Sequence, residues 1–222
     1  MVKNVQGFTM LEFIVVIGII GMIAAIILPV LSRAKENGRQ ATCLGNLREL
    51  GTGMRMYADD YDGRLPDALI GWHEGDNPNG NWAGGYEADG FCEIEKGQIY
   101  PYIKSAGVFL CPSDVGSSAH QISGPAAVRY PLSYAMNYML GYQNLDADVA
   151  PANRVGLLLH ENRWTIGGGG FLSGPDVGFS DLPSDAHFGG TCVLYCDLHG
   201  SWKKFDDVMQ AVSSGAWDPA KP

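Results

Sequence analysis

The hydrophobic pattern of the chain begins with an apolar run over residues 8–31, after a short polar stretch. The only ionisable side chain in this run is Glu12. A helix of this length is about 36 Å long, which is enough to cross the hydrocarbon core of a bilayer. A carboxylate inside such a helix costs about 2.5–3.5 kcal/mol on insertion scales, so a lone Glu is rarely incidental there. The pattern therefore predicts a transmembrane helix that carries one functional carboxylate.

From Arg33 onward the pattern becomes amphipathic. Charged residues fill most positions, and apolar residues recur close to every 3.6 residues, at Leu44, Leu47, Met54 and Tyr57, with Leu50 and Gly51 between them. No linker separates this pattern from the apolar run. We therefore expect one long, gently bent helix whose second part, residues 32–58, packs its apolar stripe on a globular head. Gly63 and Pro66 are typical of the end of such a helix.

The remaining residues, 59–222, predict a β-rich head. Apolar runs predict a buried strand at 157–161 and a hairpin of two strands at 191–196 and 200–205, with its turn at 197–200. The 30 glycines and the low share of charged residues, 18%, also favour a loop-rich β structure. The expected fold class is α+β, with the long N-terminal helix packed against an antiparallel sheet.

Charge and motif content narrow the function. The net charge of −9 argues against nucleic-acid binding, which requires a basic patch. Two His-Glu pairs, at His73 and His160, lack the second histidine four residues on that a zinc protease needs. The sequence contains neither a Gly-x-Ser-x-Gly nucleophile elbow nor a phosphate-binding loop. We therefore expect a protein that is not an enzyme.

The motif at the start of the apolar run, from Gly7 to Glu12, resembles the N-terminus of type IV prepilins and of type II secretion pseudopilins. The resemblance implies a leader peptide of residues 1–7 that is cut between Gly7 and Phe8, followed by N-methylation of Phe8. It implies that Glu12, the fifth residue after the cut, pairs with the N-terminal amine of a neighbouring subunit. Pro29 matches a proline that is common in pilin helices.

This resemblance implies a pilin-like fold and a structural role in a type IV pilus-like or pseudopilus filament. The expected partners are further copies of the chain, held through their N-terminal helices, the prepilin peptidase, the filament assembly machinery and the membrane. The expected location is the inner membrane before assembly and a periplasmic or extracellular filament afterwards. The sequence leaves open whether the filament is a surface pilus or a secretion pseudopilus.

Other interpretations remain open at this point. The apolar run also fits a plain N-terminal anchor, and Glu12 can bond the amine of its own Phe8 or reach the lipid headgroups. A membrane-tethered binding protein would display Trp72, Trp82 and Tyr86 on an aromatic loop. A tethered enzyme would use three other residues, namely His187, Asp197 and His199.

Several segments of the head also resemble a subgroup of prepilin-like proteins from environmental bacteria such as planctomycetes. These segments are residues 43–48, 57–63, 99–103 and 108–112. Near the C-terminus, the subgroup has a His, nine residues and then Asp-Gly-His. His187 and Asp197 match this motif, but Leu198 stands where Gly is expected. Glycine there would permit a positive φ, and we expect Gly200 to supply it instead.

The five cysteines would face an environment that allows disulfides if the leader lies in the cytoplasm. The favoured pair is Cys43 with Cys111, because the resemblance places both in segments that are standard for the family. Cys92 with Cys192 or Cys196 is the next choice, and an odd count leaves at least one cysteine unpaired. The alternative is that all five are free and buried.

No cofactor is expected, and the metal ligands, if there are any, are not determined by the sequence. Calcium is the ion considered for the turn formed by Asp59, Asp60 and Asp62, because it would relieve the repulsion among crowded carboxylates. His187, Asp197 and His199 offer a second possible metal site, and the commoner role of such a trio is to satisfy the polar groups of buried turns.

Overall fold

The computed structural model describes residues 9–68, 81–84, 93–114, 132–149, 151–162, 170–171 and 182–219. The predicted cleavage site, Gly7 and Phe8, lies outside these residues, as do Trp72, Tyr86 and Cys92. The chain forms two compact units, Met1–Gly38 and Arg39–Pro222.

Helix α1, Met10–Asp60, is a single helix of 51 residues that continues through Pro29. At its start, Thr9 and Glu12 form a reciprocal capping box. The Glu12 carboxylate accepts hydrogen bonds from the Thr9 backbone N–H and hydroxyl, both at 2.8 Å, and the Thr9 hydroxyl accepts from the Glu12 N–H at 3.3 Å. The expected long N-terminal helix is therefore confirmed, and its first turn is capped by its own side chains.

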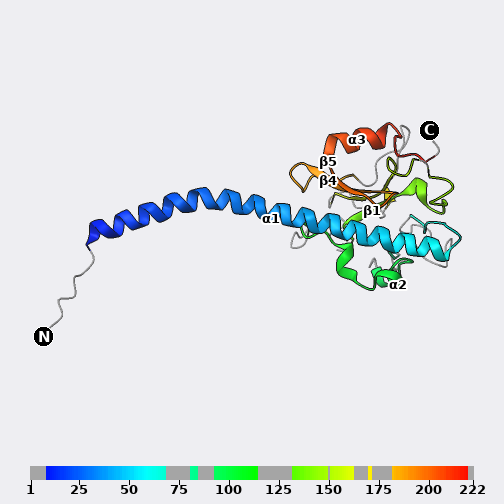
Figure 1. Cartoon of the computed structure of the whole chain (residues 1–222), viewed down its shortest axis with the longest axis horizontal. Coiled ribbons are helices and arrows are strands. Elements are labelled where there is room, and N and C mark those ends of the chain that lie inside the picture. The colour runs from blue at the N-terminus through cyan, green and yellow to red at the C-terminus, as the bar shows by residue number, and fades with distance from the viewer. Residues whose placement is uncertain are drawn as a thin grey trace, which may run out of the picture. The chain divides into compact units, whose positions relative to one another are not determined.

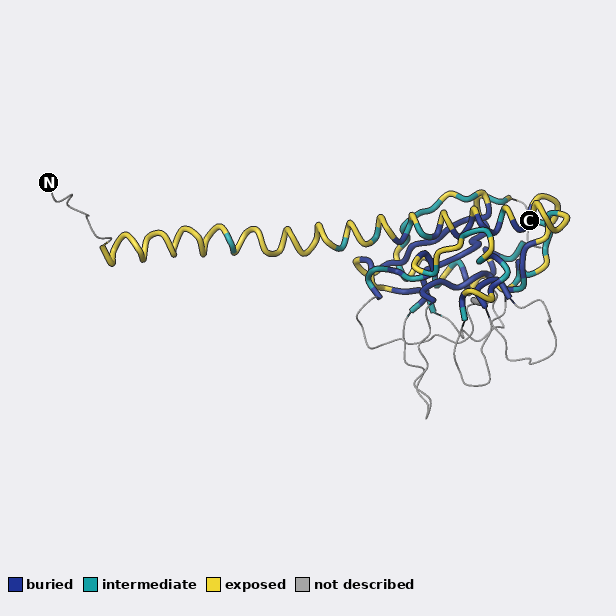
Figure 2. Tube along the Cα trace, turned by 90° about the horizontal axis from the view of Figure 1, so that it is seen from below, coloured by how far each residue is buried: buried dark blue, intermediate teal, exposed yellow. Residues whose placement is uncertain are grey.

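The large apolar side chains of α1 between residues 10 and 31 are all exposed, in contrast to the later part of the helix (Figure 2). This part is long and apolar enough to cross a membrane. We call residues 10–31 the apolar segment of α1.

The part of α1 from residue 39 onward belongs to the head, and we call residues 39–60 the head segment of α1. Its inner face is buried at close to helical spacing, at Cys43, Leu47, Leu50, Gly51, Gly53, Met54, Tyr57 and Ala58. The predicted stripe is confirmed, although Leu44 is only partly buried. Residues 39–60 of α1 therefore belong to the same compact unit as the rest of the head.

Within the described residues of the head, the sheet has five strands in the order β3-β1-β2-β4-β5. Their bounds are β1 Tyr134–Asn137, β2 Gly156–His160, β3 Gly170–Phe171, β4 Gly190–Tyr195 and β5 Gly200–Lys204. Four strands pair antiparallel, as expected, and the short β3 pairs parallel with β1 at the sheet edge. The predicted strand at 157–161 corresponds to β2, and the predicted hairpin corresponds to β4 and β5.

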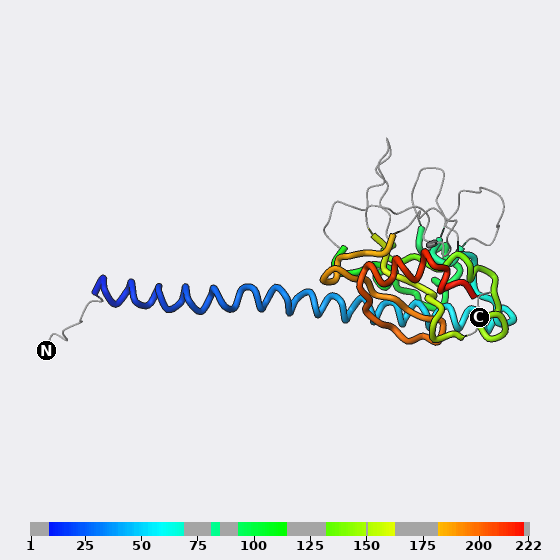
Figure 3. The backbone as a smooth tube through the Cα atoms, turned by 90° about the horizontal axis from the view of Figure 1, so that it is seen from above, coloured from blue at the N-terminus to red at the C-terminus, as the bar shows by residue number. Residues whose placement is uncertain are grey.

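Both faces of the sheet are covered by helix (Figure 1). Along β4, Cys192 and Leu194 point into the core that includes the head segment of α1. Val193 and Tyr195 point to the opposite face, where α3, Phe205–Ser213, covers the strands (Figure 3). A strand that is covered on both faces is apolar at successive positions instead of alternating, which is why β4 is buried throughout.

Four short helices complete the head: η1 Ile94–Lys96, α2 Tyr100–Ile103, η2 Ala106–Phe109 and η3 Tyr138–Leu140. Ile94, Val108 and Phe109 from these elements are buried in the same core as the head segment of α1. These short helices therefore contribute to the core that lies between the sheet and the head segment of α1.

The turn between β4 and β5 differs from the expectation. Leu198 itself takes the left-handed conformation, with φ +67°, and Gly200 has no positive φ. A left-handed conformation costs a non-glycine residue about 1–2 kcal/mol. The Leu198 side chain packs against the core beside Gly51, which offsets part of this cost.

Candidate assembly helix and buried cysteine–histidine cluster

Two features of the molecule lack an obvious role in folding a single chain. The first is the exposed apolar segment of α1, with Glu12 near its start. The second is a cluster formed by Cys43, Cys111, His160 and His187, all buried in the head. Both involve residues that the sequence singles out, and the structure gives each a local geometry.

Glu12 has a local hydrogen-bond partner in Thr9. The presence of a Glu at this position therefore does not by itself imply a partner on another subunit. A capping box satisfies backbone N–H groups at the start of a helix and is served by either Glu or Gln. Both hydrogen bonds that Thr9 donates go to the same carboxylate oxygen, Oε2. The capping role therefore does not require the negative charge, whereas pairing with a cationic amine does.

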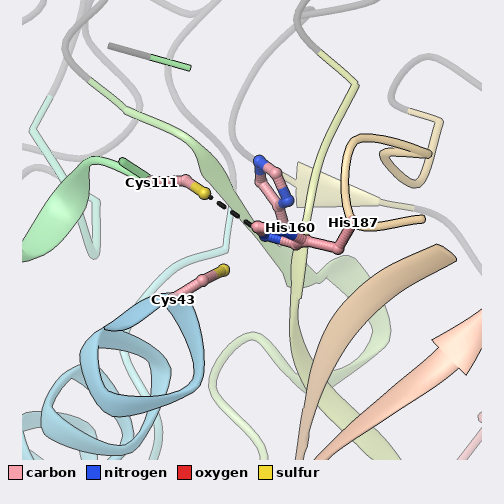
Figure 4. Close-up of side chains that lie close together, drawn as sticks. All are labelled: Cys43, Cys111, His160 and His187. Carbon is pink, nitrogen blue, oxygen red and sulfur yellow. Dashed lines mark hydrogen bonds between the residues drawn. The ribbon is translucent and has the colours of Figure 1, made fainter. Parts of the chain in front are cut away.

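The cysteine–histidine cluster is assembled from four separate segments (Figure 4). Cys43 lies on the inner face of α1, and Cys111 follows η2. His160 is the last residue of β2, and His187 lies in the turn before β4. One sulfur or ring nitrogen from each residue lies within 4.8 Å of those of the others.

Hydrogen bonds fix the orientation of both histidines. His160 Nε2 lies 2.7 Å from the carboxylate of the buried Asp114. The Asp114 N–H in turn donates to the carbonyl of Cys111 at 3.0 Å, which ties the carboxylate to the cysteine loop. The indole N–H of Trp202 donates to the His187 carbonyl at 2.8 Å, and the His187 Nε2 lies 3.4 Å from the Cys111 sulfur.

Among the described residues, the second ring nitrogen of His160 has no hydrogen bond to balance its burial. His160 Nδ1 is buried and has no hydrogen-bond partner among the residues that the structure describes. A buried polar atom without a partner costs about 1–3 kcal/mol, so such an atom in an otherwise well-packed core requires an explanation.

The electrostatics of the cluster favour sulfur in its thiolate form at one position. A hydrogen bond from Cys43, together with the nearby rings of His160 and His187, holds the pKa of Cys111 well below its ordinary value. Burial, reinforced by the neighbouring sulfurs, raises the pKa of Cys43. Burial by itself would lower the pKa of His160, but the hydrogen bond to Asp114 and the interaction with the nearby Cys111 sulfur outweigh it and raise this pKa to about 10.

The structure differs from the expected disulfide. Cys43 and Cys111 lie close together, as the favoured pairing requires, but both are free cysteines, and so are Cys192 and Cys196. The two sulfurs share their surroundings with two imidazoles, so the four residues form a potential ligand set and not an isolated pair of thiols. The pairing of Cys92 falls outside the described residues.

The trio weighed as a metal or enzyme site does not form one group. His187 is fully buried in the cluster. Asp197 and His199 are not members of it, and these two partly exposed side chains bond each other at the hairpin turn. The cluster instead includes His160, which the sequence singles out only as part of a His-Glu pair. The sequence signal that could have identified His160 is its position at the end of a predicted strand, in a chain with several cysteines and histidines.

Two other candidate sites have ordinary structural roles. Asp59 accepts a hydrogen bond from Arg55, and Asp60 accepts one from the Tyr102 hydroxyl, so these carboxylates already have partners in the proposed calcium turn. Trp82, expected on a displayed aromatic loop, is fully buried and stacks on Phe109 with ring centroids 6.2 Å apart. It belongs to the core and not to a binding surface.

Comparison with known proteins gives no neighbour for this chain, because no family model, no curated protein and no solved structure matches it.

Proposed function

We propose that the chain is a structural subunit of a membrane-anchored helical filament of the type IV pilus or type II secretion pseudopilus class. A prepilin peptidase would remove residues 1–7, and the assembly machinery would polymerise the subunits through their N-terminal helices. The observation that carries the proposal is the exposed apolar segment of α1, with Glu12 in its first turn.

The apolar segment supports the proposal because it needs a partner. Exposed apolar surfaces larger than a few hundred Å² mark interaction sites or membrane contacts in proteins. Lipid would cover this surface before assembly, and the helices of neighbouring subunits would cover it in a filament. Gly18 and Gly21 have open space where a Cβ would stand, and such small residues allow close approach of helices.

The carboxylate supports the proposal because of its cost and its position. A lone Glu in a membrane segment is expensive unless it is paired. In a filament, the cationic amine of Phe8 on an adjacent subunit would neutralise it, and this pairing would set the register between subunits. Because the pairing needs a charge and the capping box does not, the two roles of Glu12 can be separated by mutation.

The experiment compares wild type with Glu12→Gln, Glu12→Ala and Thr9→Ala in cells that carry the assembly machinery. Material sheared from the surface is examined by electron microscopy, and the subunit N-terminus by mass analysis. We expect wild-type filaments whose subunits begin with methylated Phe8. Glu12→Gln keeps the cap but lacks the charge, so it should abolish the polymer as fully as Glu12→Ala. Thr9→Ala removes the cap and leaves the charge, so it should still assemble.

Other outcomes are equally informative. A wild-type subunit that still begins at Met1 would overturn the proposal and leave a plain anchored domain. Assembly of Glu12→Gln at the wild-type level, with loss only in Glu12→Ala, would reduce Glu12 to a helix cap. Cleaved wild-type protein that stays in the membrane fraction without surface filaments would favour a pseudopilin or a minor subunit over a major pilus subunit.

A further inference from the structure

We propose that Cys43, Cys111, His160 and His187 form a structural zinc site inside the head. This inference goes beyond the proposed filament role and does not depend on it. The four residues offer two sulfurs and two imidazole nitrogens, the ligand set that tetrahedral structural zinc sites use. All four side chains are buried, and they converge from four segments of the chain.

The geometry is close to what zinc requires. With Zn–S distances of about 2.3 Å, the two sulfurs of a tetrahedral site lie about 3.8 Å apart, and nitrogen ligands bind slightly closer to the metal. The ligand atoms of the cluster lie within 4.8 Å of one another. A zinc ion would therefore need the ligand atoms to draw together by about 1–1.5 Å at most.

His160 provides the observation that points to a ligand independently of the cluster itself. Its Nε2 lies against the Asp114 carboxylate, while its buried Nδ1 has no hydrogen-bond partner among the described residues. In metal sites, a histidine typically gives one nitrogen to the metal and donates the other N–H to a carboxylate. His160 and Asp114 have this arrangement, and Nδ1 is the nitrogen left for the ion.

The charges also balance with a divalent ion in place. Binding would release to solvent the protons that the ligand sulfurs and ring nitrogens still carry, and the two thiolates of Cys43 and Cys111 would neutralise Zn²⁺. An uncompensated charge is costly in a buried position, whereas this centre is neutral apart from the Asp114 carboxylate, which bonds His160. The Tyr134 hydroxyl lies 3.6 Å from the Cys43 sulfur and is oriented to donate to it, as donors around zinc thiolates commonly do.

The site is structural and not catalytic, because it is closed. A catalytic zinc has three protein ligands and keeps one position for water or substrate, whereas this cluster supplies four ligands, all buried. The ion would link α1, the loop after η2, β2 and the turn before β4 at one point. Cys192 lies nearby in the same core and its sulfur contacts the Gln40 carbonyl at 3.9 Å, but it is not one of the four residues whose ligand atoms converge.

The test uses the full chain, purified in detergent without chelator or reductant, so that assembly plays no part in it. Elemental analysis should find about one zinc ion per chain. X-ray absorption of this wild-type protein should show two sulfurs at about 2.3 Å and two nitrogens at about 2.0–2.1 Å. Cobalt exchanged into the site should give the absorption of a tetrahedral cobalt–thiolate centre. These readouts need no variant, so they stand even if ligand variants fail to fold.

Variants then assign the ligands. Cys111→Ser and His187→Ala should each lose the metal, and the matched control Cys196→Ser, which changes a buried free cysteine outside the cluster, should retain it. Asp114→Asn should weaken zinc affinity about 10–100-fold while leaving the cobalt spectrum tetrahedral, because it alters only the positioning of His160.

Three results would overturn the proposal. One is a Cys43–Cys111 disulfide in the purified chain, found by mass analysis without reduction. Another is a folded wild-type chain that binds neither zinc nor cobalt. The third is a bound metal whose absorption spectrum shows no sulfur ligand, or whose binding is lost as readily in Cys196→Ser as in Cys111→Ser.

Discussion

The apolar segment and the head segment of α1 belong to one helix but meet their apolar surfaces in different ways. Ile20 in the apolar segment is 60% exposed, whereas Leu50 in the head segment is fully buried. The head segment has charged residues on its outer face, and its apolar inner face is buried in the core of the head. The apolar surface of the head segment is therefore covered within the same chain. The apolar segment has no polar face, and its large apolar side chains are exposed.

Because of this difference, the two segments contribute to different equilibria. Burial of the head segment contributes to the folding free energy of the head. Burial of the apolar segment contributes to membrane insertion and, under our proposal, to filament assembly. The same substitution should therefore have different effects at the two places, and the following predictions test this separation from the largest expected effect to the smallest.

Leu50→Ala should lower the free energy of unfolding of the head by about 2–5 kcal/mol, because it leaves a cavity in the core. The matched change Ile20→Ala should leave head stability unchanged, because Ile20 is exposed and is not one of the buried residues that form the head core. Chemical denaturation of the full chain in detergent, followed by tryptophan fluorescence, measures both. A loss of similar size in Ile20→Ala would show that the two segments are not independent.

Ile20→Arg should impair membrane insertion, because a cation near the centre of a transmembrane helix costs about 2.5–3.5 kcal/mol on insertion scales. Thr52→Arg, on the exposed side of the head segment, serves as the control and should insert normally. Fractionation of cells into membrane and soluble material checks this. Recovery of Ile20→Arg wholly in the membrane fraction would argue against residue 20 lying inside the bilayer.

Two glycines of the head segment should respond to alanine with opposite signs. A Cβ at Gly45 meets no atom within 4 Å, so Gly45→Ala should stabilise the helix by about 0.5–1 kcal/mol. A Cβ at Gly51 would clash with the Leu194 side chain, so Gly51→Ala should cost about 1–3 kcal/mol in overpacking, less the same helical gain. Thermal unfolding of both variants measures the difference. Equal stabilisation by both would mean that the helix does not press on β4 at Gly51.

The smallest effect is expected at the hairpin turn. Leu198→Ala removes the packing of the side chain and keeps the strain of its positive φ. Leu198→Gly loses the same packing but relieves about 1–2 kcal/mol of that strain. We therefore expect Leu198→Gly to be no less stable than Leu198→Ala, with both within about 2 kcal/mol of wild type. A clearly less stable glycine variant would contradict the left-handed conformation of Leu198.

The sequence by itself determined the features that depend on local periodicity. The change from an all-apolar run to an amphipathic stripe placed the two segments of α1. Gly63, which has a φ of +78° and whose N–H bonds the carbonyl of Ala58, follows the helix end as predicted. The alternation of short apolar runs and turn residues placed β2 and the hairpin of β4 and β5. Each of these features is set by neighbours within a few residues, which is the range over which a pattern can be read.

Tertiary structure alone decided the contacts between distant segments. Spacing along the chain could not show that His187 joins Cys43, Cys111 and His160 and leaves Asp197 and His199 at the surface. Nor could it show that Leu198 takes a strained φ because its side chain packs beside Gly51. These outcomes depend on how the sheet, α1 and the connecting loops pack together, because side chains far apart in sequence meet only after the core has closed.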